Sequence, residues 1–271
     1  MSKTLLSIED LRVTYGRGRD AAEVLHGLNL SVRAGEAIGL VGESGSGKSV
    51  ASLAVMKLLG NAGWINGGRI SFEGEDLAQV NELRMRTLRG SRLSMIFQDP
   101  ATALNPVFTI GTQLSDVVRA HRQLRGSAID REVESILEQV GFRDPRRAMK
   151  AYPHELSGGM KQRAMIAAAI VCKPALLIAD EPTTALDVTV QKQIVDLLRT
   201  LVSDLNLGLV FITHNLDLMA ELCSRAVVLR HGSVVEEGDV SDIFLRPSHE
   251  YTRQLIASIP RLPSVSTARL S

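Results

Sequence analysis

The chain has 271 residues, of which 45% are hydrophobic and 23% charged, and its 31 basic and 30 acidic residues leave a net charge of +1. This composition is typical of a globular protein, and the charge balance shows no excess of either sign that would point to nucleic acid or a membrane surface as a partner. The two cysteines, Cys172 and Cys223, are too few for a disulfide framework or a cysteine metal site, so we expect reduced thiols in a cytosolic protein.

The N-terminal part predicts strands and no targeting signal. The first four residues lead directly into a strand-like pattern, without the long apolar run of a signal peptide. Leu5–Val13 and Val24–Val32 alternate as exposed antiparallel strands do. Ala37–Val41 is apolar on both faces, which predicts a buried parallel strand, and the pattern of Ser49–Leu59 predicts the helix that follows it.

The middle of the chain interrupts this order. Thr112–Arg125 and Ile129–Val140 have helical patterns, and the whole stretch between about Asp99 and Leu156 contains no convincing strand. We interpret this stretch as a helical lobe inserted into an α/β core.

The second half of the chain returns to alternating helix and strand. Helical patterns at Gly158–Val171 and Val190–Leu205 alternate with apolar strands at Ala175–Ala179 and Leu209–Thr213, an order that implies a parallel sheet. No apolar stretch approaches the roughly 20 residues that span a bilayer, so any membrane-spanning part must belong to another chain. The remaining predicted elements are a hairpin and a loose tail: Val227–Arg230 with Ser233–Glu236, and Arg261–Ser271.

A glycine-rich loop between the strand Ala37–Val41 and the next helix fits the pattern G-x-x-x-x-G-K-[ST]. Its glycines let the backbone curl so that successive N–H groups point at phosphate oxygens, and the helix N-terminus adds a partial positive charge. Lys48 is expected to reach the β and γ phosphates, and the Ser49 hydroxyl to ligate Mg²⁺. We therefore predict that a nucleotide binds to eight consecutive residues: Gly42, Glu43, Ser44, Gly45, Ser46, Gly47, Lys48 and Ser49.

The strand Ala175–Ala179 ends in two adjacent carboxylates, Asp180 and Glu181. Asp180 is expected beside the phosphate loop, where it can hold Mg²⁺ through the water shell of the ion. Glu181 is then the candidate for polarising the attacking water. The alternative is that the two acidic residues and Pro182 only end a strand and begin a turn, but the phosphate loop upstream favours the catalytic interpretation.

A second anion-binding segment precedes the predicted helix Gly158–Val171. Ser157 is a good N-cap, and Gly158 and Gly159 leave backbone N–H groups uncovered. One chain rarely needs two phosphate cradles for one nucleotide. Two chains arranged head to tail would use both, because the second cradle of each chain would close on the γ-phosphate held by the other.

The segment around this second cradle, Leu156–Arg163 (LSGGMKQR), resembles the signature motif of ABC transporter ATPases, whose usual form is LSGGQ. Met160 stands in place of the glutamine. The resemblance extends over roughly Leu6–Ile259, and the other motifs of the family occur in the expected order. It implies that Tyr15 stacks on the adenine ring.

The same resemblance assigns roles to three further segments. Gln98 matches the Q-loop residue that contacts Mg²⁺ and the attacking water, and His214 matches the switch histidine that contacts the γ-phosphate. Ala185-Leu186-Asp187 matches the D-loop at the dimer seam. With the residues above, this gives a catalytic set of Glu181, His214 and Lys48, and Mg²⁺ ligands Ser49, Gln98 and Asp180.

The fold class implied is α/β: a P-loop NTPase (RecA-like) parallel sheet core with an N-terminal antiparallel β subdomain and an inserted helical subdomain. We expect one ABC ATPase domain over residues 1–245, with the helical subdomain at about 99–165, and a C-terminal helix and loose tail over 246–271.

Finer features resemble the oligopeptide, dipeptide and nickel importer branch of the family. They are the segment Gln98–Pro106 (QDPATALNP), the methionine in the signature segment, and Pro247–Thr252 (PSHEYT). Many members of this branch carry a C-terminal cysteine cluster that binds iron–sulfur. Neither cysteine of this chain lies in that region, so we expect no such cluster.

These resemblances imply an ATP- and Mg²⁺-dependent ATPase peripheral to the cytoplasmic face of the inner membrane. Its expected partners are a second ABC ATPase (a paralogue, giving a heterodimer), two membrane permease subunits and an extracytoplasmic substrate-binding protein, with no nucleic acid. The transported solute, a peptide, nickel or a metal chelate, is left open.

Two alternatives belong to other classes. A soluble ABC-type ATPase of DNA repair, chromosome handling or translation usually carries two cassettes or a long coiled coil, whereas Lys48 and Asp180 are separated by too few residues to hold one. A GTPase lacks support because there is no N-K-x-D motif, and a small-molecule kinase has no use for the segment at Leu156.

Overall fold

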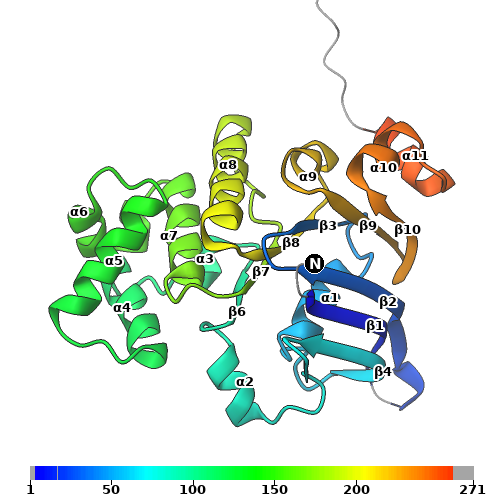
Figure 1. Ribbon diagram of the computed structural model, residues 1–271, viewed down its shortest axis with the longest axis horizontal. Helices are drawn as coiled ribbons and strands as arrows, with labels where there is room; N and C mark the ends of the chain where they lie inside the picture. The colour runs from blue at the N-terminus through cyan, green and yellow to red at the C-terminus, as the bar shows by residue number, and fades with distance from the viewer. Residues whose placement is uncertain (1–3, 17, 259–271) are drawn as a thin grey trace, which may run out of the picture.

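The computed structural model describes residues 4–16 and 18–258, and its central feature is a six-stranded sheet (Figure 1). The strand order is β10-β9-β3-β8-β7-β6, and all neighbours are parallel except β9 and β10. The strands are β3 Ala37–Val41, β6 Leu93–Ile96, β7 Leu176–Asp180, β8 Gly208–Thr213, β9 Arg225–Arg230 and β10 Ser233–Asp239.

The three middle strands β3, β8 and β7 are buried along their whole length, which is why their sequences are apolar on both faces. The register places Val41 opposite Thr213 and Asp180 opposite Ile212. The carboxyl ends of the parallel strands therefore lie at one edge of the sheet, where ligands bind in open α/β sheets. The sequence did not predict β6, because four residues are too short a pattern to recognise.

A second, antiparallel sheet has the order β2-β1-β4-β5. Its inner face packs on α1 (Lys48–Val55) and on the parallel sheet, and only its outer face is exposed, so the expectation of exposed strands holds for one face only. Glycines interrupt the alternation of β4, and the sequence did not predict it. The strands are β1 Thr4–Tyr15, β2 Ala22–Arg33, β4 Gly63–Phe72 and β5 Glu75–Asp76.

Helix α1 follows the phosphate loop as predicted but is shorter than the predicted Ser49–Leu59. It ends at Val55, and Lys57 has a φ of 54°. A left-handed residue at this position terminates the helix, because it turns the chain out of the helical path. The apolar residues after Val55 instead pack against the antiparallel sheet.

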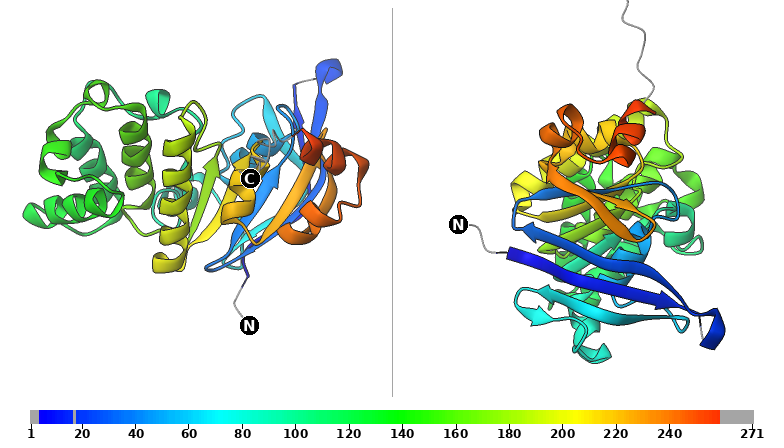
Figure 2. Two further views of the ribbon diagram at one scale, coloured as in Figure 1. Left: turned by 90° about the horizontal axis from the view of Figure 1, so that it is seen from above. Right: turned by 90° about the vertical axis from the view of Figure 1, so that its right-hand side faces the viewer.

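The helical lobe occupies one end of the molecule, away from β1, β2 and α11 (Figure 1; Figure 2, left view). Its apolar faces form one core with the adjacent face of the parallel sheet, because Ile110, Leu114, Val133 and Leu137 are fully or almost fully buried. Its elements are α3 Pro100–Ala103, α4 Ile110–His121, α5 Ser127–Gln139, α6 Pro145–Lys150, the 3₁₀ turn Pro153–Glu155 and α7 Gly158–Ile170.

The remaining helical elements lie outside the helical lobe, and the first of them joins β1 to β2. They are the 3₁₀ turn Gly18–Asp20, α2 Glu82–Leu88, α8 Val188–Leu205, α9 Leu216–Leu222, α10 Val240–Leu245 and α11 Glu250–Ala257. Within the described part of the chain, none of the helices is long and apolar enough to cross a membrane. The predicted loose tail Arg261–Ser271 lies outside the described residues. Cys172 and Cys223 are buried free thiols.

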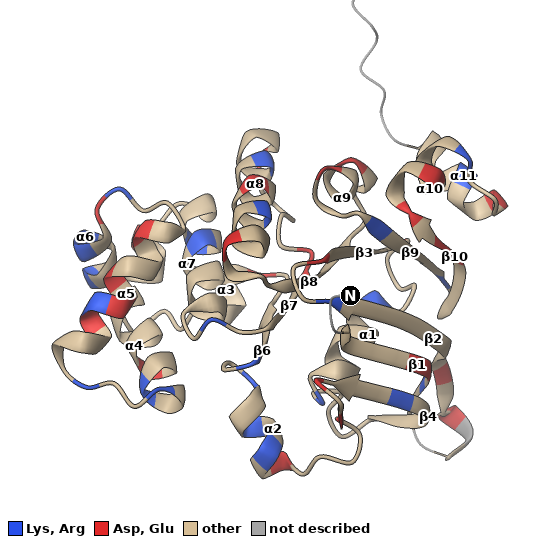
Figure 3. Ribbon diagram, in the orientation of Figure 1, with Lys and Arg blue, Asp and Glu red and all other residues tan. Residues whose placement is uncertain are grey.

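Charged side chains lie mainly on the helices and on the outer strands, with both signs mixed on each lobe (Figure 3). The middle strands of the parallel sheet carry almost none, as their burial requires.

Candidate nucleotide-binding and catalytic site

The loop Gly42–Gly47 leaves the end of β3 and enters α1 at Lys48. Two positions of the loop require glycine, because neighbouring atoms leave no room there for a Cβ. A Cβ on Gly42 would lie 2.1 Å from the carbonyl oxygen of Leu229, and a Cβ on Gly47, whose φ is 107°, would lie 2.7 Å from Leu25 Cδ2. The loop is therefore pressed against β9 and β2, and only glycine fits at these two positions.

Lys48 is buried, and its ammonium group is directed into the loop itself. Nζ donates hydrogen bonds of 2.8 Å to the carbonyl oxygens of Gly42 and Glu43, and lies 3.4 Å from Ser46 Oγ. Burial lowers the pKa of Lys48, while the carboxylates of Glu181, Asp180 and Glu43 act in the opposite sense. A positive charge is thus held at the centre of a curled backbone, where a phosphate group would meet it.

Asp180 ends β7 and is buried beside this loop. Its Oδ1 has no hydrogen-bond partner within the described residues. Burial raises the pKa of Asp180, and the neighbouring Ser49 hydroxyl acts in the opposite sense. A buried acceptor without a partner calls for a missing donor or cation. Oxygen atoms from a carboxylate and a hydroxyl are the ligands that Mg²⁺ prefers, so these residues fit the ion.

Glu181 is the centre of a cluster that joins three predicted residues. Its Oε2 accepts hydrogen bonds from Gln98 Nε2 at 3.1 Å and from Thr184 Oγ1 at 3.0 Å, and its Oε1 lies 3.2 Å from His214 Nδ1. Gln98, Glu181 and His214 follow the ends of β6, β7 and β8, which are neighbours in the sheet. Tertiary structure therefore brings together side chains that are far apart in the sequence.

Sequence reasoning missed Thr184. The available signal was local: a hydroxyl three residues after the carboxylate, in a turn that the Thr184 N–H closes on the Glu181 carbonyl at 3.2 Å. Glu181 itself has a φ of 46°, a left-handed backbone conformation that is uncommon for a residue other than glycine. The turn therefore holds the residue that carries the carboxylate in a strained conformation.

Tyr15 lies at the end of β1, outside the cluster around Glu181. Its half-buried ring packs on the backbone of Gly63 in β4, since a Cβ on that glycine would lie 2.7 Å from the ring. Burial raises the pKa of the Tyr15 hydroxyl. Stacking of this ring on adenine stays a prediction.

The second cradle begins α7 and lies on the helical lobe, apart from α1 (Figure 1). Ser157 caps the helix, because its Oγ accepts a hydrogen bond from Met160 N at 3.3 Å. Ser157 and Gly158 are exposed, and a Cβ on Gly159 would lie 2.9 Å from Val190 Cγ1 of α8. The cradle therefore faces solvent, supported from behind by the helix that follows the predicted D-loop.

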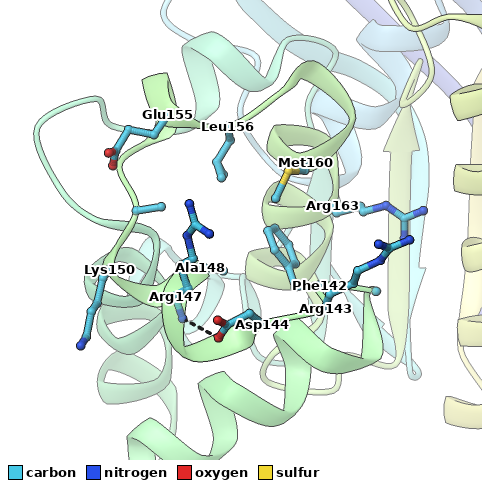
Figure 4. Close-up of a pocket in the computed structure, with 12 residues that line it drawn as sticks. Phe142, Arg143, Asp144, Arg147, Ala148, Lys150, Glu155, Leu156, Met160 and Arg163 are labelled. Carbon is cyan, nitrogen blue, oxygen red and sulfur yellow. Dashed lines mark hydrogen bonds between the residues drawn. The ribbon is translucent and has the colours of Figure 1, made fainter.

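A cavity of about 680 Å³, which the sequence did not predict, adjoins this cradle (Figure 4). Met160 and Leu156 of the signature segment line it together with Phe142. Its basic lining residues are Arg143, Arg147, Lys150 and Arg163, and the acidic ones are Asp144, which accepts a hydrogen bond from Arg147 N at 3.0 Å, and Glu155. None of the phosphate-loop residues lies in it.

Comparison with known proteins agrees with this geometry. A sequence model of the ABC transporter family matches residues 25–184. A putative peptide import ATP-binding protein of Brucella abortus is 48% identical over 265 residues, covering 95% of this chain and 78% of that protein. The dipeptide transport ATP-binding protein DppD of Escherichia coli is 46% identical over 256 residues, with coverage of 94% and 78%. The oligopeptide transport ATP-binding protein OppD of Salmonella typhimurium is 44% identical over 270 residues, with coverage of 100% and 80%.

Solved structures show the same architecture. A dimeric ATP-binding cassette in a post-hydrolysis state, bound to ADP and Pi, superposes with a TM-score of 0.77 over 87% of this chain and 99% of that one. Because the two sequences are only 24% identical, this match supports the fold and nothing further. The protein cbiO1 of Clostridium perfringens, part of the complex cbiONQ, has a TM-score of 0.76 at 25% identity, with coverage of 95% and 96%.

The parallel sheet, the phosphate loop at its carboxyl edge and the inserted helical lobe define a nucleotide-binding P-loop ATPase. Given the family match and the relatives above, the chain belongs to the ABC transporter family, in which it is an ATP-binding ATPase. The predicted fold class, ATP binding and enzyme class are confirmed, as is the resemblance to the peptide importer branch.

Proposed function

We propose that the chain is the ATP-hydrolysing subunit of an importer that moves peptides through separate membrane permease subunits. The observation that carries the proposal is the convergence of Gln98, Glu181 and His214 beside the loop that holds Lys48. The relatives named above are peptide, dipeptide and oligopeptide transport proteins, which favours a peptide over nickel or a metal chelate. Their names likewise disfavour a soluble ATPase of DNA repair or translation.

In the proposed mechanism, the phosphates of ATP occupy the curl of Gly42–Ser49, and adenine stacks on Tyr15. Lys48 exchanges its bonds to the Gly42 and Glu43 carbonyls for the β and γ phosphate oxygens. Mg²⁺, when bound, neutralises charge on these oxygens. Ser49 and Gln98 would hold the ion directly, and Asp180 would hold it through water. The amide NH₂ of Gln98 donates a hydrogen bond to Glu181, which leaves Gln98 Oε1 available to the ion.

Glu181 acts as the general base in this proposal. Among the described residues, two donors bond to Oε2, whereas only His214 lies within hydrogen-bond distance of Oε1, so a lone pair of Oε1 is available to the proton of the attacking water. His214 orients the carboxylate through Nδ1 and presents its other ring nitrogen to the γ-phosphate. The side chain of His214 is exposed, which lets it respond when the γ-phosphate leaves.

The second cradle is proposed to act in trans. Ser157 and Gly158 are exposed on the helical lobe, and we assign them to the γ-phosphate bound by a second ATPase, a paralogue in a heterodimer. Closure would supply donors that one chain lacks, so hydrolysis depends on dimerisation. Hydrolysis would then open the dimer and move the helical lobe.

We further propose that an exposed apolar surface on the helical lobe, formed by Val107 and Phe108, receives a permease subunit. Val107 is 69% exposed and Phe108 49% exposed. The segment that carries them runs beside the chain leading into exposed Tyr152, because Ile110 N donates a 2.9 Å hydrogen bond to the Ala151 carbonyl. Ala151, which accepts this bond, is a lining residue of the cavity in Figure 4. In this arrangement the ATPase is peripheral, on the cytoplasmic face of the inner membrane.

The test is reconstitution of the detergent-purified complex in liposomes with its extracytoplasmic binding protein. We expect a peptide-loaded binding protein to stimulate ATP hydrolysis and peptide uptake. Stimulation by nickel or a metal chelate, but not by peptides, would reassign the solute. Purification with ribosomes or DNA and without permeases would overturn the transport role.

A further inference from the structure

The phosphate loop is held from outside by a residue distant in the sequence. The backbone N–H of Glu43 donates a 2.9 Å hydrogen bond to the hydroxyl oxygen of Tyr251, which belongs to α11 and is 2% exposed. We propose that Tyr251 is a positioning residue for the phosphate loop and thereby sets its affinity for ATP. This inference rests on the proposed assignment of Gly42–Ser49 as the ATP phosphate site.

Tyr251 is itself fixed in place by several contacts. The guanidinium carbon of Arg230 lies 4.8 Å from the centre of its ring, a cation–π contact. Its backbone N–H donates to His249 Nδ1 at 3.1 Å, which caps α11. The carboxylate of Glu236 accepts hydrogen bonds from the N–H groups of Ser248 and His249 at 2.7 and 3.1 Å. Strand β10 thus anchors the start of α11, and α11 anchors the loop.

The hydroxyl of Tyr251 can hold the loop in its curled conformation while ATP is bound, which Lys48 cannot do. In the described structure Lys48 holds the Gly42 and Glu43 carbonyls from inside the loop. When its ammonium turns to phosphate, those bonds are given up. The bond from Glu43 N–H to Tyr251 does not involve Lys48, and together with the 2.9 Å bond from Gly232 N to the Ser46 carbonyl it keeps the loop curled.

Tyr251→Phe is the direct test, because it removes the hydroxyl and keeps the ring under Arg230. Losing one hydrogen bond of ordinary strength lowers the fraction of loops in the binding-competent conformation, and the apparent Kd rises in inverse proportion. We expect the Kd for MgATP, measured by isothermal titration calorimetry on the full chain, to rise about 3- to 10-fold. In the assembled complex KM should rise similarly while kcat at saturating ATP stays unchanged, because bound ATP restores the loop.

Thr252→Ser is the matched control: Thr252 is a buried residue on the same helix and makes no hydrogen bond to the loop among the described residues, and serine removes only its methyl group and keeps the hydroxyl beside Glu236. We expect its Kd for MgATP to equal that of the unmodified chain. Equal Kd values for Tyr251→Phe and the unmodified chain would overturn the inference, as would an equal rise in Kd and fall in Tm for both variants. Failure of the unmodified chain to bind MgATP would overturn the proposed site as well.

Discussion

Replacement of Glu181 by glutamine tests the catalytic site most directly. The change keeps the size of the side chain and removes its ability to accept a proton. A glutamine oxygen can still accept from Gln98 and Thr184 at the position of Oε2, and its NH₂ group can face His214, whose Nδ1 then accepts in the other tautomer. The surroundings of the side chain therefore tolerate the amide.

The expected loss can be worked from this geometry. The amide NH₂ replaces Oε1, the atom proposed to accept a proton from the attacking water, so the proposed general-base contribution would be lost in full. That contribution is typically about 10²- to 10⁴-fold, or roughly 3–5 kcal/mol of activation free energy. Because the hydrogen bonds are replaced, the free energy of unfolding should change by only about 1 kcal/mol.

The assay is phosphate release by the assembled complex at saturating MgATP, with nucleotide affinity measured separately. We expect turnover to fall by about 10²- to 10⁴-fold while the Kd for MgATP stays within about 3-fold. Glu138→Gln, the same chemical change at an exposed position of α5, is the control and should leave turnover unchanged. Turnover within about 5-fold of normal for Glu181→Gln would refute the assignment of Glu181 as the base.

Three further predictions concern the loop, the second cradle and the permease surface. Lys48→Ala should raise the Kd for MgATP at least about 10-fold by calorimetry, because a charge-assisted contact to phosphate is lost; an unchanged Kd would contradict the site. Ser157→Arg should leave MgATP binding intact but block turnover of the dimer, and normal turnover would argue against closure in trans. Phe108→Asp should leave MgATP binding unchanged and reduce the amount of permease recovered in detergent pull-downs. Full recovery of the permease would contradict the proposed permease surface.

Local chemistry accounts for the parts of the site that the sequence predicted. The loop Gly42–Ser49 and the start of α7 at Ser157 are contiguous segments whose binding groups are mostly their own backbone N–H groups, so residue order alone specifies them. The position of Asp180 and Glu181 at the end of a strand could be predicted, because the apolar run of that strand stops at these two carboxylates. The assignments of Gln98 and His214 came from the resemblance to the family.

Other features depend on contacts that no local pattern contains. The sequence singled out Pro247–Thr252 as a branch feature without a role, and its contact with the phosphate loop joins residues 208 positions apart. The cavity beside Met160 is likewise formed by segments that meet only in the folded lobe. The sequence did not predict strand β4, because its glycines interrupt the alternation of apolar and polar residues. Its antiparallel pairing with β1 is seen only in the folded structure.

The sequence by itself determined that this chain has a parallel sheet, a curled glycine-rich loop at the start of a helix and an inserted helical lobe. Burial on both faces and glycine-dependent backbone conformations produce recognisable patterns in consecutive residues. Only the tertiary structure decided that Glu181 shares hydrogen bonds with Gln98 and Thr184 beside His214, and that Tyr251 supports Glu43. Those contacts depend on which strands become neighbours and on how a C-terminal helix packs, and both are settled by the energy of the whole core.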